Sequence, residues 1–214
     1  MTTGRDSSTR PARTRFGWLR AASDRVPTRW FAGIATALFL AATAAFGGLA
    51  TAATPDITAL EPGDEHRNDQ VAMTIDRAVL IDEFEDAGVY VEEGERVLAL
   101  LVSVENTWDE PLSATPDSSV TQSLTVDGLG DPPDSVARYD DATINPVLQP
   151  GVPAQIVLAW AVEADAFDDA QELKLTFNDM TLHTGSFVAN GQWWTDPVAA
   201  ATVSIAVEDI GAGG

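Results

Sequence analysis

The feature that most constrains the fold of this chain is a series of short runs, all after residue 70, in which apolar side chains occupy every second position. Successive side chains of a β-strand point to opposite faces, so this period is typical of a strand with one buried face. The two clearest runs predict half-buried strands, with inward-facing Leu173, Leu175 and Phe177 in one and Val203, Ile205 and Val207 in the other.

Two further runs are almost continuously apolar and predict central strands of a sheet. Residues 96–108 read RVLALLVSVENTW, and residues 155–162 read QIVLAWAV. Their inward-facing residues are expected to be Leu98, Leu100, Val102 and Val104 in the first run, and Ile156, Leu158, Trp160 and Val162 in the second. Weaker strand candidates are residues 71–81, 118–126, 142–148 and 186–190.

Turn residues separate these runs. Pro150-Gly151 precedes the second central strand, and Asn190-Gly191 is a pair that favours a two-residue β-hairpin. No amphipathic helix of useful length follows residue 54. Short strands with turn signals throughout, about seven to nine of them, predict an all-β, antiparallel β-sandwich over residues 71–209. A disordered tail is expected at 210–214.

The N-terminal part of the chain has a different pattern. Residues 1–29 hold seven arginines against two acids, and residues 30–55 carry no charged side chain. Arginine before an uncharged apolar stretch is typical of an N terminus that inserts into a membrane with its basic side in the cytoplasm. We therefore expect a disordered cytoplasmic tail at 1–29, one transmembrane helix or uncleaved signal anchor at 30–53, and an extracytoplasmic remainder in a bacterial cell membrane.

A cleaved signal peptide is the alternative for the same segment. Ala50-Thr51-Ala52 fits the small-x-small cleavage rule, and cleavage near Ala52 would release a secreted protein. In both cases the rest of the chain is exported. Residues 54–70 hold two prolines, one glycine and several charges, which predicts a linker.

Charge and cysteine content exclude several functions. The chain after residue 55 has 31 acidic and five basic side chains. Nucleic acid is therefore not an expected partner, because phosphate binding needs clustered lysine and arginine. The chain has no cysteine, which excludes disulfides, thiolate metal sites and lipid attachment through a lipobox cysteine.

The densest acidic cluster suggests a calcium site. It consists of Asp82, Glu83, Glu85, Asp86, Glu92 and Glu93. Calcium takes six to eight oxygen ligands, which these residues would supply if their two groups flanked a hairpin around Gly88. The EF-hand pattern fails, since Phe84 stands where a third-position ligand is needed. A solvated acidic loop is the alternative, and no other cofactor is expected.

Three tryptophans are candidates for contact with a partner. Trp193 and Trp194 follow a turn, and Trp108 precedes an acidic turn. Adjacent residues of a strand point to opposite faces, so we expect one of the pair to be buried and the other exposed. An exposed indole can stack on a sugar ring or anchor a protein partner. Covering the end of the sandwich is the alternative role.

Catalysis is not expected. The two histidines, His66 in the linker and His183 in a strand, lack a neighbouring nucleophile motif. The sequence contains no G-x-S-x-G, H-E-x-x-H or phosphate-binding loop pattern. Carboxylates are too abundant for any chosen pair to indicate a glycosidase.

Two segments carry a resemblance to a known group of proteins. GERVLALLVSVENTWDEPL, at 94–112, and LQPGVPAQIVLAWAVEADA, at 148–166, resemble an exported bacterial immunoglobulin-like domain family of mostly unknown function, related to the mycobacterial immunoprotective antigen-type β-sandwich. The resemblance covers roughly residues 70–208 and implies an immunoglobulin-like fold and an exported location. It implies no catalytic residues, and the lipoprotein cysteine of many members is missing here.

The sequence thus predicts a membrane-anchored, extracytoplasmic binding or accessory module without catalytic activity. Its partners are expected to be the membrane, through residues 30–53, and another envelope protein or a wall component. The alternatives are a calcium-dependent adhesion or sensing domain, secreted or anchored, and an accessory subunit of an envelope transporter.

Overall fold

The computed structural model describes residues 28–45, 57–186 and 190–211, and the chain divides into two units, Met1–Thr54 and Pro55–Gly214. The described part of the first unit is helix α2 (Thr28–Ala45). No helix in the described ranges is both long enough and apolar enough to cross a membrane. The transmembrane helix expected over 30–53 is therefore not found in the described residues, which within that stretch are those of α2 up to Ala45. Residues 46–53, including the expected cleavage point at Ala52, and residues 1–27 lie outside the described residues.

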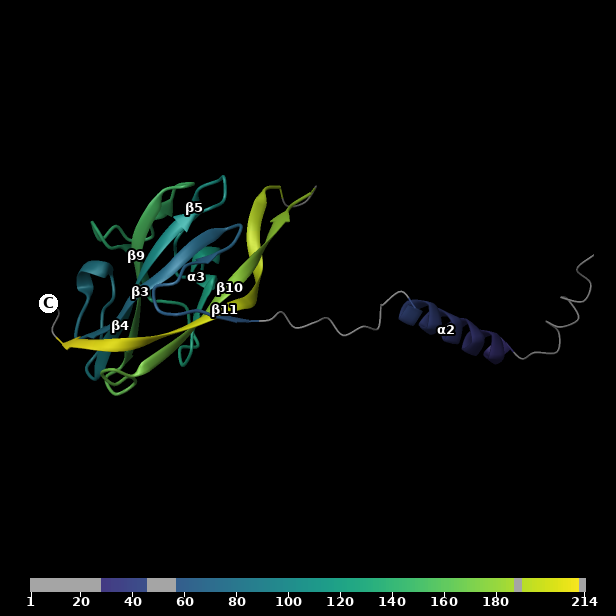
Figure 1. Ribbon diagram of the computed structural model, residues 1–214, viewed down its shortest axis with the longest axis horizontal. Coiled ribbons are helices and arrows are strands. Elements are labelled where there is room, and N and C mark those ends of the chain that lie inside the picture. Colours follow the sequence, from purple (N-terminus) through teal and green to yellow (C-terminus); the bar gives the residue numbers. More distant parts are fainter. Residues whose placement is uncertain (1–27, 46–56, 187–189, 212–214) are drawn as a thin grey trace, which may run out of the picture. The chain divides into compact units, whose positions relative to one another are not determined.

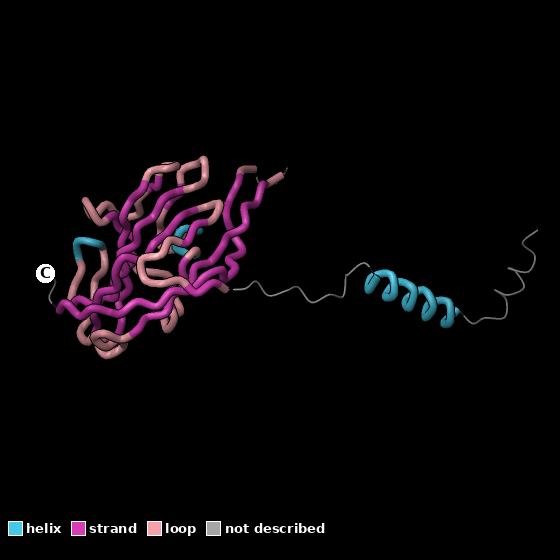
Figure 2. The backbone as a smooth tube through the Cα atoms, viewed as in Figure 1, coloured by secondary structure: helices cyan, strands magenta, loops and turns pink. Residues whose placement is uncertain are grey.

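The second unit is a β-sandwich (Figures 1 and 2). Nine of its described strands follow one continuous order, β6-β10-β11-β3-β4-β9-β7, with β1 beside β11 and β2 beside β3, while β5 and β8 pair in a separate two-stranded sheet. The long strands are β3 (Val71–Ile81), β4 (Glu95–Asn106), β9 (Pro153–Glu163), β10 (Glu172–Thr184) and β11 (Gln192–Gly211). The short elements are β1 (Thr58–Ala59), β2 (His66–Arg67), η1 (Glu85–Ala87), β5 (Leu112–Ser113), α3 (Ser119–Gln122), β6 (Leu124–Val126), β7 (Ser135–Arg138) and β8 (Val147–Leu148).

Strand β11 joins the two layers of the sandwich. Its first part pairs antiparallel with β10, from Thr184↔Gln192 to Glu172↔Ala206. Its last part pairs parallel with β3, starting at Val207↔Ala78. The expectation of a purely antiparallel sandwich is therefore wrong at β11, which also pairs in parallel with β1. At 20 residues, β11 is long enough to pair with β10 in one layer and then with β3 at the edge of the other layer.

The core lies between the two layers. The inward-facing residues predicted for 96–108, 155–162 and 173–177 are all buried and belong to one cluster. In the last strand Val203 and Val207 are buried, and Ile205 is partly buried against the same cluster. Because β10 contributes from one layer and β4 and β9 from the other, this cluster holds the layers face to face.

A second apolar cluster covers the outer face of the β3-β4-β9 layer. Val97, Ala99 and Val157 are buried there although they point away from the main core. The loop at 82–94 covers them with Val89, which is buried, and with partly buried Phe84 and Val91. Ser135 fixes this loop by donating a hydrogen bond to the carbonyl of Ala87.

Three of the weaker strand predictions need correction. Residues 118–126 begin with helix α3, which Ser118 caps by accepting a hydrogen bond from the backbone amide of Thr121 at 3.4 Å, and only 124–126 form a strand, β6. Of 142–148 only β8 is a strand, and at 186–190 the described end residues are not in a strand while 187–189 lie outside the description.

The expected linker at 54–70 needs a further correction. Within it, β1 pairs with β11 and β2 pairs with β3, so these residues belong to the sandwich sheets. The Asn68 side chain accepts hydrogen bonds from the amides of Gln70 and Val71, which turns the chain into β3. Pro62 and Gly63 therefore mark a turn between β1 and β2.

Candidate functional site

The end of β10 and the start of β11 form a two-stranded extension of the sandwich, seen at the upper right of the domain in Figure 1. We call residues 181–184 and 192–195 the ribbon. Its cross-strand pairs run from Thr181↔Thr195 to Thr184↔Gln192. The two-residue hairpin expected at Asn190-Gly191 is wrong, because the connection between the strands runs from 185 to 191. Because this connection is longer than two residues, the pairing register of the ribbon is set by its cross-strand side-chain pairs and not by the turn.

A β-bulge separates the ribbon from the rest of β11. The register between β10 and β11 shifts between Asp179 and Thr181, opposite Asp196 and Pro197. Asp196 has a left-handed backbone with φ of 54°. Aspartate tolerates this backbone conformation better than most residues. A β-bulge changes the direction in which the side chain of the bulged residue points.

The redirected carboxylate of Asp196 binds His183. Its Oδ2 lies 2.8 Å from Nε2 of the imidazole. His183 is the direct cross-strand partner of Trp193, and the two rings lie 6.3 Å apart at their centroids with planes 16° apart. Trp193 is 43% exposed. The three side chains form one surface site, in which the carboxylate orients the imidazole beside an accessible indole.

The opposite face of the ribbon is fixed to the sandwich. Trp194 packs against the main core, as does Trp108 from the loop after β4. The two indoles meet edge to face, with centroids 5.8 Å apart and an interplanar angle of 88°. The prediction that Trp193 and Trp194 point to opposite faces, one outward and one inward, is confirmed by these positions. Trp108 therefore supports the ribbon, whereas Trp193 alone of the three is exposed.

Asn106 holds Trp108 in place. Its fully buried side chain accepts a hydrogen bond from the Trp108 amide at 3.0 Å and donates to the carbonyls of Glu110 and Leu148 at 2.8 and 3.0 Å. This contact gives a structural role to the asparagine of VENTW in the sequence. An asparagine that ends an apolar strand is a signal for such a role, because a buried side-chain amide must pair its donors and its acceptor with nearby backbone groups.

The acidic side chains predicted to bind calcium are not gathered around one point in the described residues. No three His, Asp, Glu or Cys side chains of the described part of the chain are grouped as ligands for an ion. Asp82 pairs with Arg96 at 3.0 Å, and Glu85 and Asp86 lie in η1. The expected hairpin around Gly88 exists, since Phe84 bridges Val89 and Gly88 has φ of 81°. However, its apolar side chains face the sheet, which directs the remaining candidates, Glu83, Glu92 and Glu93, to the exposed surface.

The second histidine lies in a different setting. His66 is in β2, where its ring stacks on Phe177 with centroids 5.2 Å apart. Its Nε2 lies 3.0 Å from Oδ1 of Asp179. The same oxygen accepts a hydrogen bond from the side-chain amide of Asn68 at 3.0 Å. His66 and Asp179 line a hollow of about 570 Å³ together with Val198. Within the described residues neither His–Asp pair is bonded to a hydroxyl that could act as a nucleophile.

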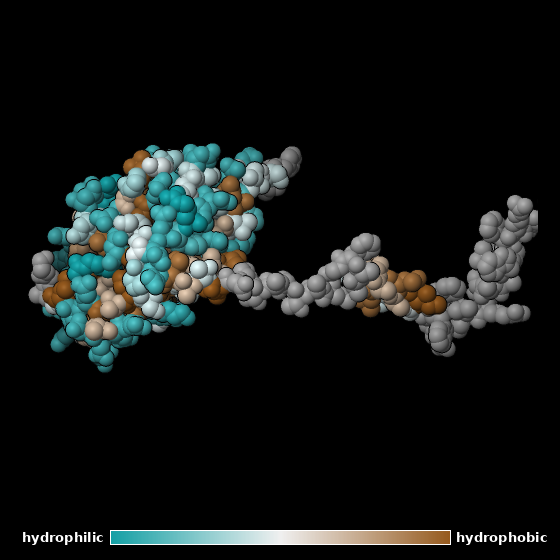
Figure 3. Space-filling view, in the orientation of Figure 1, coloured by the Kyte–Doolittle hydropathy of each residue, from teal (hydrophilic) through white to brown (hydrophobic). Residues whose placement is uncertain are grey.

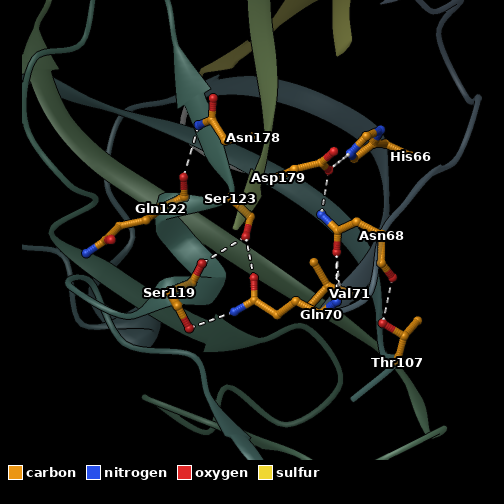
Figure 4. A network of polar contacts seen from close by, with 10 residues as sticks. All are labelled: His66, Asn68, Gln70, Val71, Thr107, Ser119, Gln122, Ser123, Asn178 and Asp179. Atoms are coloured by element: carbon orange, nitrogen blue, oxygen red, sulfur yellow. Dashed lines mark hydrogen bonds and ion pairs between the residues drawn. The ribbon is translucent and has the colours of Figure 1, made fainter. Parts of the chain in front are cut away.

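The Asp179 contacts continue into a buried polar network around α3 (Figure 4). The amide of fully buried Gln70 donates to Ser119 at 2.7 Å and accepts from Ser123 at 2.9 Å. Asn178 in β10 donates to the Gln122 carbonyl at 3.0 Å. Every group has a partner inside the domain, so the network fixes the helix to the strands.

Comparisons with known proteins give only distant similarities. No protein-family model matches the chain, and no curated protein matches it. The chain is similar to ycdA of Bacillus subtilis, provisionally described as a lipoprotein, with 14% identity, a TM-score of 0.35, and coverage of 66% of this chain and 38% of that one. The chain thus spans less than half the length of that protein.

Two other solved structures are similar at the same distance. An uncharacterized β-sandwich protein from Clostridium difficile has 12% identity and a TM-score of 0.36, with 70% of this chain and 95% of that one covered. The N-terminal domain of PorA has 13% identity and a TM-score of 0.26, with 68% and 100% covered. TM-scores this low carry no argument about function.

Proposed function

We propose that this chain is an exported, non-catalytic binding module with an immunoglobulin-like β-sandwich, which contacts another envelope protein or a wall component through its ribbon. The observation that carries the proposal is the exposed indole of Trp193. Its ring lies beside the imidazole of His183, its cross-strand partner, and the next residue, Trp194, packs against the core on the other face of the ribbon. Aromatic side chains that are exposed and well supported are the residues that most often dominate binding energies.

The rest of the surface favours contact at this point. Hydrophilic side chains cover most of the visible face of the domain (Figure 3). With 31 acids and five bases after residue 55, the domain repels anionic lipids and other acidic surfaces. The exposed indole of Trp193 is then the place where a partner gains most from the burial of apolar surface.

Export is supported by the charge pattern of the N terminus. Seven arginines precede a stretch, 30–55, without charged side chains. Membrane attachment and release after cleavage both place the sandwich outside the cytoplasm. Fractionation of expressing cells, followed by N-terminal sequencing, tests this step. An intact N terminus in the membrane fraction indicates an anchored module, and a new N terminus near Ala52 in the medium indicates a secreted one. Accumulation of intact chain in the cytosol contradicts export.

Binding itself is tested with the full-length chain. The tagged chain is incubated with envelope fractions of the organism that produces it, and the bound fraction is measured against concentration. Trp193→Ala should weaken binding about tenfold or more, since loss of a central aromatic contact costs about 2 kcal/mol. The matched control is Tyr90→Ala, which removes an aromatic ring that is 74% exposed elsewhere on the domain. Equal binding by both variants contradicts the proposal.

A further inference from the structure

We infer that the ligand of the ribbon is a neutral polysaccharide, one of whose sugar rings stacks on Trp193 while its hydroxyls bind His183 and Asp196. This inference rests on the proposed binding function and names its ligand class. The contacts that carry it are the near-parallel rings of Trp193 and His183 and the 2.8 Å bond from the imidazole to the Asp196 carboxylate.

The chemistry of this face matches that of a sugar ring. A pyranose offers an apolar C–H face, which fits an indole, and a rim of hydroxyls, which need donors and acceptors at its edge. Beside the indole, Asp196 has a carboxylate that is 67% exposed and accepts hydrogen bonds. Strand register places Thr181 and Thr195 on the same face as His183 and Trp193, which adds hydroxyls that both donate and accept.

The charges of the domain exclude an anionic polymer. Every lysine and arginine in the described sandwich already forms an ion pair with a carboxylate, and none of these pairs lies in the ribbon. The pairs are Arg67 with Glu65 and Glu105, Arg77 with Glu208, Arg96 with Asp82 and Asp209, Arg138 with Asp140, and Lys174 with Asp127. Phosphates or uronates would approach a strongly negative domain without a cation to receive them, so a neutral glycan is the ligand that fits.

The ribbon is also fixed to the rest of the domain. Trp194 and Trp108 fix one face of the ribbon to the core, so the opposite face loses little conformational freedom when it binds. Each sugar contact contributes little binding free energy, so a rigid aromatic surface suits a glycan because little of that energy is lost in ordering side chains.

The first test distinguishes a glycan from a protein partner. Envelope fractions are treated with periodate, which oxidises vicinal diols of sugars, or with a protease, and are then incubated with the full-length chain. The inference predicts that periodate reduces binding at least about tenfold and that protease leaves it unchanged. Loss of binding after protease but not after periodate overturns the inference, while the proposed binding function remains. Binding that is unaffected by Trp193→Ala overturns both.

The second test uses purified polymers and variants. Neutral glucans, mannans and galactans are compared with polygalacturonate by tryptophan fluorescence titration and calorimetry. We expect saturable binding to at least one neutral polymer and none to polygalacturonate. Trp193→Ala should lose at least about tenfold in affinity, Trp193→Phe less, and Asp196→Asn several-fold, with Tyr90→Ala unchanged. Near-UV circular dichroism confirms folding of each variant. Preference for the anionic polymer, or binding to no neutral polymer in the panel or in isolated wall glycans, overturns the inference.

Discussion

The indole of Trp194 meets the indole of Trp108 edge to face, with ring centroids 5.8 Å apart. The contact joins the ribbon to the loop that follows β4, two segments that are 86 positions apart in the sequence. Nε1 of Trp194 is buried and has no hydrogen-bond partner in the described structure, so ring packing rather than hydrogen bonding holds the pair. The exposed position of Trp193 on the other face depends on this contact.

Trp108→Ala should therefore loosen the ribbon and destabilise the domain. Removing a partly buried indole and its aromatic contact is expected to lower the free energy of unfolding by about 2 kcal/mol. Urea unfolding measures this cost, and hydrogen exchange should show faster exchange of the amides at 192–195. Trp193→Ala is the control and should change stability by less than about 0.5 kcal/mol. Equal costs for the two variants would contradict the assigned orientations.

Asn106→Leu should be more damaging than its size suggests. The substitution leaves the Trp108 amide and the carbonyls of Glu110 and Leu148 without the partner that they have now. Unpaired buried groups of this kind cost about 1–3 kcal/mol each, so we expect a loss of about 2–4 kcal/mol in unfolding free energy. Exposed Gln149→Leu is the matched control. A loss below about 1 kcal/mol for Asn106→Leu would show that water replaces the side chain.

Asp209 should make stability fall in acid. Arg96 donates to both oxygens of this carboxylate, at 2.7 and 2.8 Å, and lowers the pKa of Asp209 to about 2. A carboxylate with a lowered pKa stabilises the folded state above its unfolded pKa, and this stabilisation disappears as the pH falls from about 4 through about 2. The difference in unfolding free energy between the native chain and Asp209→Asn should thus be constant above about pH 5 and shrink toward pH 2. A difference that does not change with pH would contradict the ion pair.

Calcium should leave the melting temperature unchanged. In the loop at 82–94, Asp82 is bound to Arg96, and no three acidic side chains of the described residues converge on one point. A ligand that binds only the folded state raises its stability in proportion to the logarithm of concentration, so scans with millimolar calcium and with a chelator give a direct comparison. A rise of several degrees with calcium alone would restore the site predicted from the sequence.

The strands of the core could be predicted from the sequence because their signal is local. Alternation of apolar and polar residues identifies which face of a strand is buried, and the inward-facing residues of β4, β9 and β10 are all in the core. The opposite orientation of Trp193 and Trp194 follows from the same period of two. The exposed indole of the candidate site was therefore visible in the sequence, although its neighbours His183 and Asp196 were not assigned to it.

Pairing between distant segments could not be predicted in the same way. The acidic cluster at 82–93 resembled a ligand set, but Phe84, Val89 and Val91 turn the loop into a cover for the outer face of the sheet. The run at 118–126 has strand-like residues, but the cap at Ser118 and the buried network around Gln70 favour one turn of helix there. In both segments tertiary contacts outweigh local preference.

By itself, the sequence determined the strand faces, the all-β class, the acidic surface and the absence of thiol chemistry, because each depends on residue type and local spacing. The tertiary structure alone decided that β11 joins both layers, that β1 and β2 belong to the sheets, and that Trp108 supports Trp194. It also brought Asp196 to His183 through a bulge whose φ of 54° no local pattern specifies. Register and strand order depend on which segments bury each other's apolar surface, and that is a property of the whole chain.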